Sequence, residues 1–154
     1  MRRIKKLAFG TDHAVIEIRN NVKKYLQEID YEIEDFGFHG RGSCDYPDYA
    51  LKVAKAVVNQ KVDKGILICA TGIGMSIAAN KVKGTVAAVC WSEDTAKLAA
   101  KHNGANILCL GSRTATISEI CSRIKIFLET SFEERHARRI LKIKEIEKQS
   151  SKEG

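Results

Sequence analysis

Short apolar runs alternate with longer amphipathic stretches along the whole chain. The apolar runs predict strands at 7–10, 32–36, 65–70, 86–90 and 106–110. The stretches between and after them carry apolar residues at helical spacing, which predicts helices at 15–29, 49–59, 73–81, 94–102 and 117–129. Such alternation is typical of βαβ units around a parallel sheet, so we expect an α/β fold.

A sixth amphipathic stretch, residues 133–148, follows these units and predicts an extra C-terminal helix. Ile140, Ile143 and Ile146 lie along one side of it, but the stretch is too polar to be buried alone. We therefore expect it to lie across the body or across a partner subunit. No repeat or linker divides the chain, and Pro47, the single proline, stands at the expected start of a helix. The 154 residues are expected to form one domain, 1–154.

These elements predict a three-layer, flavodoxin-like (Rossmann-like) sandwich with a five-stranded parallel sheet and the extra C-terminal helix. Right-handed crossovers favour the strand order 2-1-3-4-5. In such sheets, ligands bind at the carboxyl ends of the strands, where the order reverses between the first and third strands. We expect the functional residues at this edge.

Two polar clusters fall at this edge of the predicted sheet. Asp12 and His13 follow the first strand, and Cys69 opens a turn of small residues after the third strand, Ala70, Thr71, Gly72, Ile73 and Gly74. Because the turn runs into a helix, its backbone N–H groups suit an anion or a developing oxyanion. Glycines in such a turn can equally serve only a tight strand-to-helix connection, so the turn alone decides nothing.

The position of Cys69 distinguishes it from the other four cysteines. A helix N-terminus stabilises a thiolate, the form that acts as a base or nucleophile. Cys90, Cys109 and Cys121 fall within strands or a helix, and Cys44 lies in a loop without an evident partner, so we interpret these four as structural. The odd number and the absence of a C-x-x-C pair favour reduced thiols over disulfides or a zinc site. We expect no metal.

Five basic side chains stand out by their positions. His13 lies at the expected crevice, His102 ends the fourth predicted helix, and Arg113 follows the fifth strand. Arg135 and Arg139 are spaced i, i+4, so on a helix both would project from one face. That face is either a solvated basic surface or a phosphate clamp, since guanidinium groups match phosphate oxygens.

The net charge of +7 lies mostly at the chain ends, since residues 1–6 contribute +4 and residues 132–154 contribute +2. The nearly balanced body lacks a basic stripe interleaved with aromatics, so we do not expect nucleic-acid binding. No apolar run approaches the roughly 20 residues of a membrane span. The apolar stretch after the basic N-terminus is interrupted at residues 10–13, unlike a signal peptide. A cytoplasmic location is expected.

Taken in order, these landmarks resemble the ribose-5-phosphate isomerase B family, which includes allose-6-phosphate and galactose-6-phosphate isomerases. The matching segments cover nearly the whole chain: 9–13, 45–47, 65–81, 102–103, 111–113, and Arg135-His136 with Arg139. The resemblance implies an isomerase of the pentose phosphate pathway that acts on a phosphorylated sugar. It further implies a homodimer with active sites shared between subunits, possible assembly into a tetramer, and no cofactor.

The resemblance also implies roles for individual residues. Cys69 would be the proton acceptor, with Thr71 orienting or activating the thiol, and His102 would be the acid that opens the furanose ring. The backbone of 70–74 would hold the enediolate, and the remaining substrate contacts would come from Asp12, His13, Asn103, Arg113, Arg135 and Arg139. Ala70 departs from the glycine of many relatives, which would cause strain if that peptide needs a positive φ. Met75 stands where another branch uses a glutamate base.

Two alternatives remain at this point. One is an isomerase of a six-carbon sugar phosphate, which would differ in pocket length and not in chemistry. The other is a phosphate-binding module without catalysis on the same scaffold, because a fold does not fix a function. Cys69 together with His102 favours the enzyme, since a binding module would need neither.

Overall fold

The structure is a computed structural model that describes residues 4–13 and 16–153. Its elements are β1 (Lys6–Thr11), α1 (Ile16–Glu28), β2 (Glu32–Asp35), α2 (Tyr46–Val58), β3 (Lys64–Cys69), α3 (Ile73–Ala79), β4 (Ala87–Val89), α4 (Glu93–Lys101), β5 (Ile107–Gly111), α5 (Ile117–Glu129), η2 (Glu134–His136) and α6 (Ala137–Glu153). The five predicted strands and the six predicted helical stretches are confirmed, with bounds that shift by a few residues. Val15, the predicted start of the first helix, lies outside the described residues. None of the helices in these ranges is long and apolar enough to cross a membrane.

The strands form one parallel sheet in the order β2-β1-β3-β5-β4. The predicted order 2-1-3-4-5 is therefore wrong for the last two strands, because β5 lies beside β3 and β4 is at the edge. All five residues of β5 are buried, whereas the three residues of β4 are only half-buried. A short, partly covered strand suits a sheet edge, and a wholly apolar strand suits the interior.

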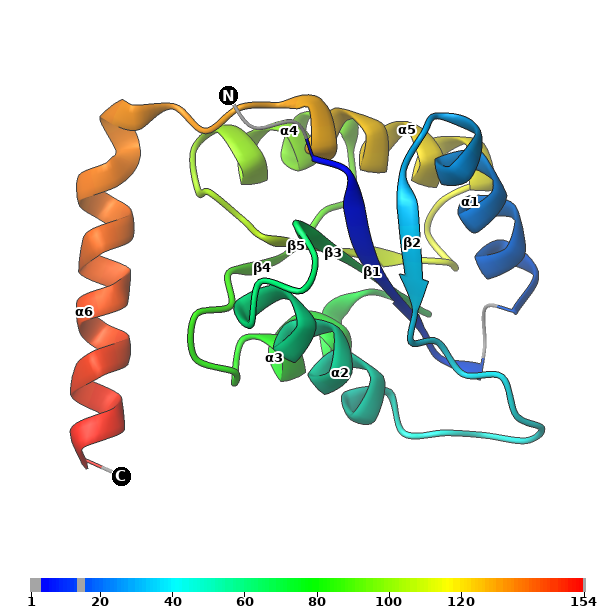
Figure 1. Ribbon diagram of the computed structural model, residues 1–154, viewed down its shortest axis with the longest axis horizontal. Coiled ribbons are helices and arrows are strands. Elements are labelled where there is room, and N and C mark those ends of the chain that lie inside the picture. The colour runs from blue at the N-terminus through cyan, green and yellow to red at the C-terminus, as the bar shows by residue number, and fades with distance from the viewer. Residues whose placement is uncertain (1–3, 14–15, 154) are drawn as a thin grey trace.

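Helices cover both faces of the sheet and complete the predicted three-layer sandwich (Figure 1). α1, α4 and α5 pack together on one face, and α2 and α3 on the other. Since right-handed crossovers in opposite directions along a sheet place their helices on opposite faces, the observed order puts α4 with α1 and α5. Two apolar cores result. Phe9 and Phe127 belong to one, and Leu67 and Met75 belong to the other.

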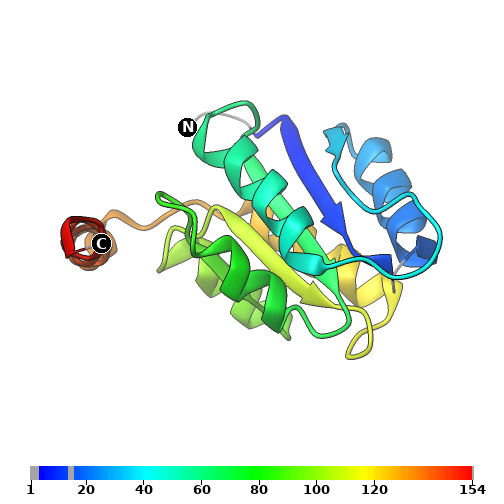
Figure 2. The ribbon, with the colours of Figure 1, turned by 90° about the horizontal axis from the view of Figure 1, so that it is seen from below.

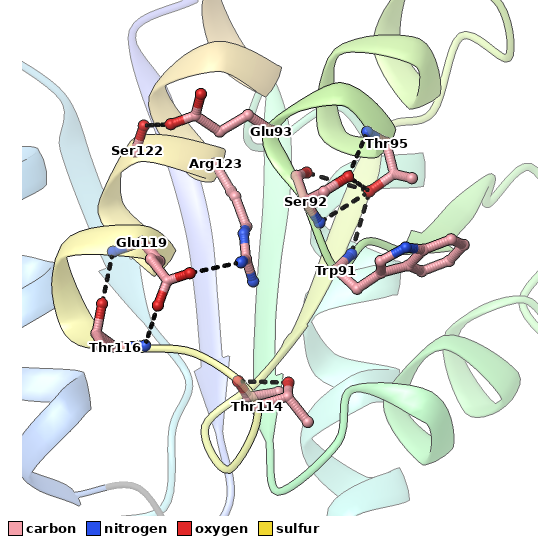
Figure 3. A network of polar contacts seen from close by, with 10 residues as sticks. Trp91, Ser92, Glu93, Thr95, Thr114, Thr116, Glu119, Ser122 and Arg123 are labelled. Atoms are coloured by element: carbon pink, nitrogen blue, oxygen red, sulfur yellow. Dashed lines mark hydrogen bonds and ion pairs between the residues drawn. The ribbon is translucent and has the colours of Figure 1, made fainter.

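The N-termini of α4 and α5 are both closed by capping boxes (Figure 3). Ser92 and Thr95 cap α4, and Thr116 and Glu119 cap α5. The buried Arg123 lies between these helices and donates from Nη2 to the Glu119 carboxylate at 3.2 Å. A hollow of about 380 Å³ beside them has more carboxylates than cations in its lining, Ser92, Glu93, Asp94, Glu119 and Arg123. The side chains of this region cap the helices, and the excess of carboxylates in the hollow would repel a phosphate.

α6 stands apart from the sandwich, on the side where the strands begin (Figure 2). The predicted helical stretch starts as the 3₁₀ turn η2, a common way to begin an α-helix, and then runs to Glu153. Gly84 N–H donates to Glu147 Oε1 at 2.9 Å, which links α6 to the loop after α3. Leu141 and Ile146 are 63% and 65% exposed. The apolar side of α6 is thus left open to another molecule.

Candidate active site

The register of the sheet brings three strand ends to one edge. Thr11 of β1 pairs with Ile68 of β3, and Cys69 pairs with Gly111 of β5. Two main-chain hydrogen bonds continue this pairing beyond the strands, from Ser112 N to Cys69 O at 2.8 Å and from Arg113 N to Ala70 O at 3.0 Å. The residues that follow these strands therefore form one group, the carboxyl-edge cluster: Asp12, His13, Cys69, the turn 70–74 and Arg113.

Cys69 is the buried thiol of this cluster. Gly72 N–H donates to its Sγ at 3.1 Å, an interaction that strengthens when the sulfur is a thiolate. Gly72 has φ +82°, and a Cβ there would lie 2.9 Å from the carbonyl carbon of Leu110. Glycine is needed to aim this N–H at the sulfur. Among the described non-glycine residues, positive φ occurs only at Asp30 and Gln60, so Ala70 fits its place without this strain.

The rest of the turn is held by its own side chains and by α2. Thr71 Oγ1 accepts the N–H of Ile73 at 3.2 Å, at the start of α3. Gly74 lies against the ring of Tyr46, since a Cβ there would lie 2.5 Å from ring carbons. Sequence reasoning missed Tyr46 as a wall of the turn. Met75 is fully buried, which agrees with its having no part in chemistry.

Three other cysteines are confirmed as structural. Cys90, Cys109 and Cys121 are all buried. Burial raises the pKa of each thiol, and it raises that of Cys90 to about 11. At neutral pH these thiols stay protonated and pack as small apolar groups.

Cys44 does have a partner, contrary to the sequence prediction. Its backbone N–H donates to His13 Nδ1 at 3.0 Å, and its Sγ lies 3.6 Å from the same nitrogen. A backbone N–H can only donate, so a neutral His13 carries its proton on Nε2. The contact joins residues 31 positions apart, so no local sequence pattern predicts it.

A second group lies where α4 ends, and we name it the amino-edge cluster: Lys101, His102, Asn103, Glu133, Arg135, His136 and Arg139. His102 caps α4, and its ring centroid lies 4.3 Å from that of His136. Glu133 forms ion pairs with Arg135 and with Lys101, and the nearby Arg135 lowers the pKa of its carboxyl. Sequence reasoning assigned no role to Glu133 or His136, although His136 stands three positions before Arg139, at helical spacing.

The two clusters lie at opposite ends of the strands, one at their carboxyl ends and the other at their amino ends. α4 starts beyond the carboxyl end of β4 and leads back to the start of β5, so its last residues, and His102 with them, return to the amino edge. One copy of the chain therefore does not bring His102 to Cys69. The expectation that Arg135 and Arg139 share one face of an α-helix is wrong, because Arg135 lies in η2. Arg135 contacts Glu133, whereas Arg139 contacts His136.

Within the described residues, one trio could be considered for a metal ion. Ligand atoms of His102, Glu133 and His136 all lie within 4.8 Å of one another. However, the Glu133 carboxylate is already paired with two cations, and His136 Nδ1 lies 3.1 Å from a guanidinium nitrogen of Arg139. Positive charge so close opposes a further cation. We assign this trio no metal.

Comparison with known proteins agrees with this geometry. The model of the Ribose/Galactose Isomerase family matches residues 7–143. Ribose-5-phosphate isomerase B of Escherichia coli is 40% identical over 145 residues, 94% of this chain and 97% of that protein. The solved ribose-5-phosphate isomerase B of Clostridium thermocellum has a TM-score of 0.91 and 44% identity, covering 94% and 99% of the two chains. The enzyme from Mycoplasma genitalium with bound ribulose 5-phosphate has a TM-score of 0.89 and 41% identity, covering 96% and 99%.

The fold and the polar strand ends thus define an α/β enzyme of the isomerase class. The chain belongs to the Ribose/Galactose Isomerase family, and its resemblance to ribose-5-phosphate isomerase B is confirmed.

Proposed function

We propose that the chain interconverts ribose 5-phosphate and ribulose 5-phosphate through an enediolate, with Cys69 as the base. The observation that carries this proposal is the Cys69 thiol at the ligand edge, beside the Gly72 N–H that would stabilise its thiolate. The thiolate takes the proton from C2 of the open-chain aldose and leaves an enediolate. A hydroxyl proton passes from O2 to O1, and the thiol returns its proton to C1, which gives the ketose.

The carboxyl-edge cluster supplies the remaining groups around this transfer. Backbone N–H groups of residues 70–74 stabilise the enediolate as fixed dipoles, and Thr71 orients the thiol. Asp12, which is buried, and His13 contact the sugar and its phosphate end. Since its Nδ1 accepts the Cys44 N–H, a neutral His13 approaches the substrate as a donor through Nε2.

The amino-edge cluster of a second copy completes the site. His102 of that copy is the acid that opens the furanose ring, Asn103 contacts the substrate, and Arg135 and Arg139 bind phosphate. Arg113 of the carboxyl-edge cluster also contacts the substrate. The opposite placement of the two clusters supports a homodimer with shared sites. Exposed apolar residues beside each cluster support it too: Ile73 and Ile77 on α3, and Leu141, Ile143 and Ile146 on α6. Association of dimers into a tetramer stays a prediction.

The alternative substrates are allose 6-phosphate and galactose 6-phosphate. The ribulose 5-phosphate bound to the Mycoplasma genitalium enzyme favours the five-carbon sugar for this chain as well. Cys69 disfavours a phosphate-binding module without catalysis. Such a module would need no thiol that receives a hydrogen bond from a backbone N–H.

A coupled assay of the three sugar phosphates tests the proposal. We expect turnover of ribose 5-phosphate to exceed that of the two hexose phosphates. Cys69→Ala should lower kcat by about 10²–10⁴-fold, the typical contribution of a general base, with substrate binding largely kept. Cys121→Ala, which removes a buried thiol on α5, should keep kcat and lose some stability. Near-normal turnover by Cys69→Ala would remove the mechanism, and preference for a hexose phosphate would change the substrate.

A further inference from the structure

His136 is a buried histidine, 5% exposed, at the end of η2. Its Nδ1 lies 3.1 Å from Nη1 of Arg139. A guanidinium only donates hydrogen bonds and stays protonated in proteins, so Nδ1 must accept and present its lone pair. A neutral His136 therefore carries its proton on Nε2. That atom is buried and has no hydrogen-bond partner among the described residues, so no neighbour there draws the proton elsewhere.

The surroundings of His136 also oppose a second proton. Burial lowers its pKa most, followed by the charges of Arg135, His102 and Arg139. Glu133 acts in the opposite direction, but its carboxylate is paired with Arg135 and with Lys101 of α4. A proton on Nδ1 would also point an N–H at the guanidinium N–H groups of Arg139. The ring stays neutral at neutral pH.

The neighbour of this ring is the proposed acid, His102. The two ring centroids are 4.3 Å apart and the ring planes are inclined by 35°. Two imidazolium rings at this distance would repel each other, whereas a neutral ring tolerates a charged one and offers it a π face. A neutral His136 therefore packs beside His102 without charge repulsion.

We propose that His136 is a positioning residue for His102, locked by Arg139 as a neutral ring protonated on Nε2. This role rests on the proposed function, in which His102 opens the furanose ring. The ring of His136 holds the plane of the His102 ring, and Arg139 thereby has a second role beside phosphate binding.

Nitrogen NMR of ¹⁵N-histidine-labelled protein tests, without substrate, whether Arg139 holds His136 as a neutral ring protonated on Nε2. We call this arrangement the lock. In the wild type, His136 should keep the pattern of an Nε2-protonated neutral ring between about pH 5 and 8. His102→Asn and His136→Asn assign the signals. Arg139→Met removes the donor, so His136 should then titrate in that range. Arg138→Met removes an exposed cation from the same helix and should leave the His136 pattern unchanged. Titration of His136 in the wild type, or a proton on Nδ1, would overturn the proposal.

Kinetics separate the positioning role from the proposed function. His136→Asn can still accept the Arg139 hydrogen bond but removes the ring beside His102. Its kcat should fall about tenfold with a shifted alkaline limb, where the required acid is lost, while KM changes little. An unchanged kcat and alkaline limb would remove the positioning role. If the lock is seen by NMR but no sugar phosphate turns over, the proposed function fails and the lock stands. If turnover is normal but His136 titrates, the lock fails and the function stands.

Discussion

The carboxyl-edge and amino-edge clusters differ in how they are built. At the carboxyl edge, Cys69 is buried and receives a backbone N–H through a glycine turn that packs against the next strand. At the amino edge, the groups are side chains: Lys101 and Arg135 pair with one carboxylate, and Arg139 contacts one of two adjacent histidine rings. One edge offers a buried thiol and fixed backbone dipoles, and the other offers cations and histidine rings.

The difference suits two separate tasks of the proposed reaction, proton transfer at one cluster and phosphate binding with ring opening at the other. The proposed proton transfer at carbon needs its base and N–H groups held within fractions of an ångström, which backbone and sheet provide. The proposed phosphate recognition and ring opening use side chains on a turn and a projecting helix. Because a single chain keeps the two sets at opposite edges, a second copy is the simplest way to unite them.

The largest expected effect comes from mixing two inactive variants, Cys69→Ala and His102→Asn. In a closed two-fold dimer, a hybrid carries both lesions in one site and leaves the other site whole. Random re-association makes about half of the dimers hybrid, so activity should return to about a quarter of wild type. Activity is measured after the variants are unfolded and refolded together, with hybrids confirmed by differently tagged subunits. No recovery despite confirmed hybrids would place Cys69 and His102 of each site in one chain.

A smaller effect is expected from Gly72→Ala, which tests the backbone half of the comparison. Gly72 and Gly42 have the same φ of +82°, but a Cβ at Gly42 meets nothing within 4 Å. Each substitution costs about 1–2 kcal/mol of folding free energy for the left-handed backbone. Only Gly72→Ala also clashes with the Leu110 backbone and moves the N–H at Cys69 Sγ. Its kcat should fall about 10²-fold, as for a misplacement of roughly 1 Å.

Gly42→Ala is the control, and thermal unfolding and kcat are measured for both variants. We expect Gly42→Ala to lose stability and keep its kcat. If the two variants lose stability equally and Gly72→Ala keeps normal turnover, the N–H of Gly72 has no part in the chemistry.

Much of the fold could be predicted from the sequence because its signals are local. Apolar runs and helical spacing revealed each strand and helix, including the separate C-terminal helix. The order of β4 and β5 could not be derived from crossover handedness alone, since both orders allow right-handed connections. A usable signal was the contrast between Ala87–Val89, which is short and weakly apolar, and the continuous apolar run of β5.

The candidate site, like the fold, could be predicted from the sequence only where its signals are local. The cysteine with its small-residue turn and the position of His102 could be identified from motif and place in the chain. The contacts of His13 with Cys44, and of Glu133 with Lys101, join residues more than 30 positions apart, so no periodic pattern predicts them. The prediction that Arg135 and Arg139 share one helix face failed because Arg135 lies in a 3₁₀ turn. The i, i+4 spacing aligns side chains only within a continuous α-helix.

The smallest of these effects concerns the amino edge, where Arg135→Ala and Arg139→Ala test phosphate binding. A hydrogen bond to a charged group is worth about 1.5–3 kcal/mol, so each should raise KM for ribose 5-phosphate roughly ten- to hundredfold. Competition by inorganic phosphate should weaken in parallel, since it probes the phosphate subsite without the sugar. Arg138→Ala removes the same charge from an exposed position on the same helix, where screening by salt leaves little long-range effect. Its KM should stay within about twofold of wild type by that screening. Equal effects of all three would mean that the arginines act only through their summed charge, as a solvated basic face, and that the amino edge holds no phosphate clamp.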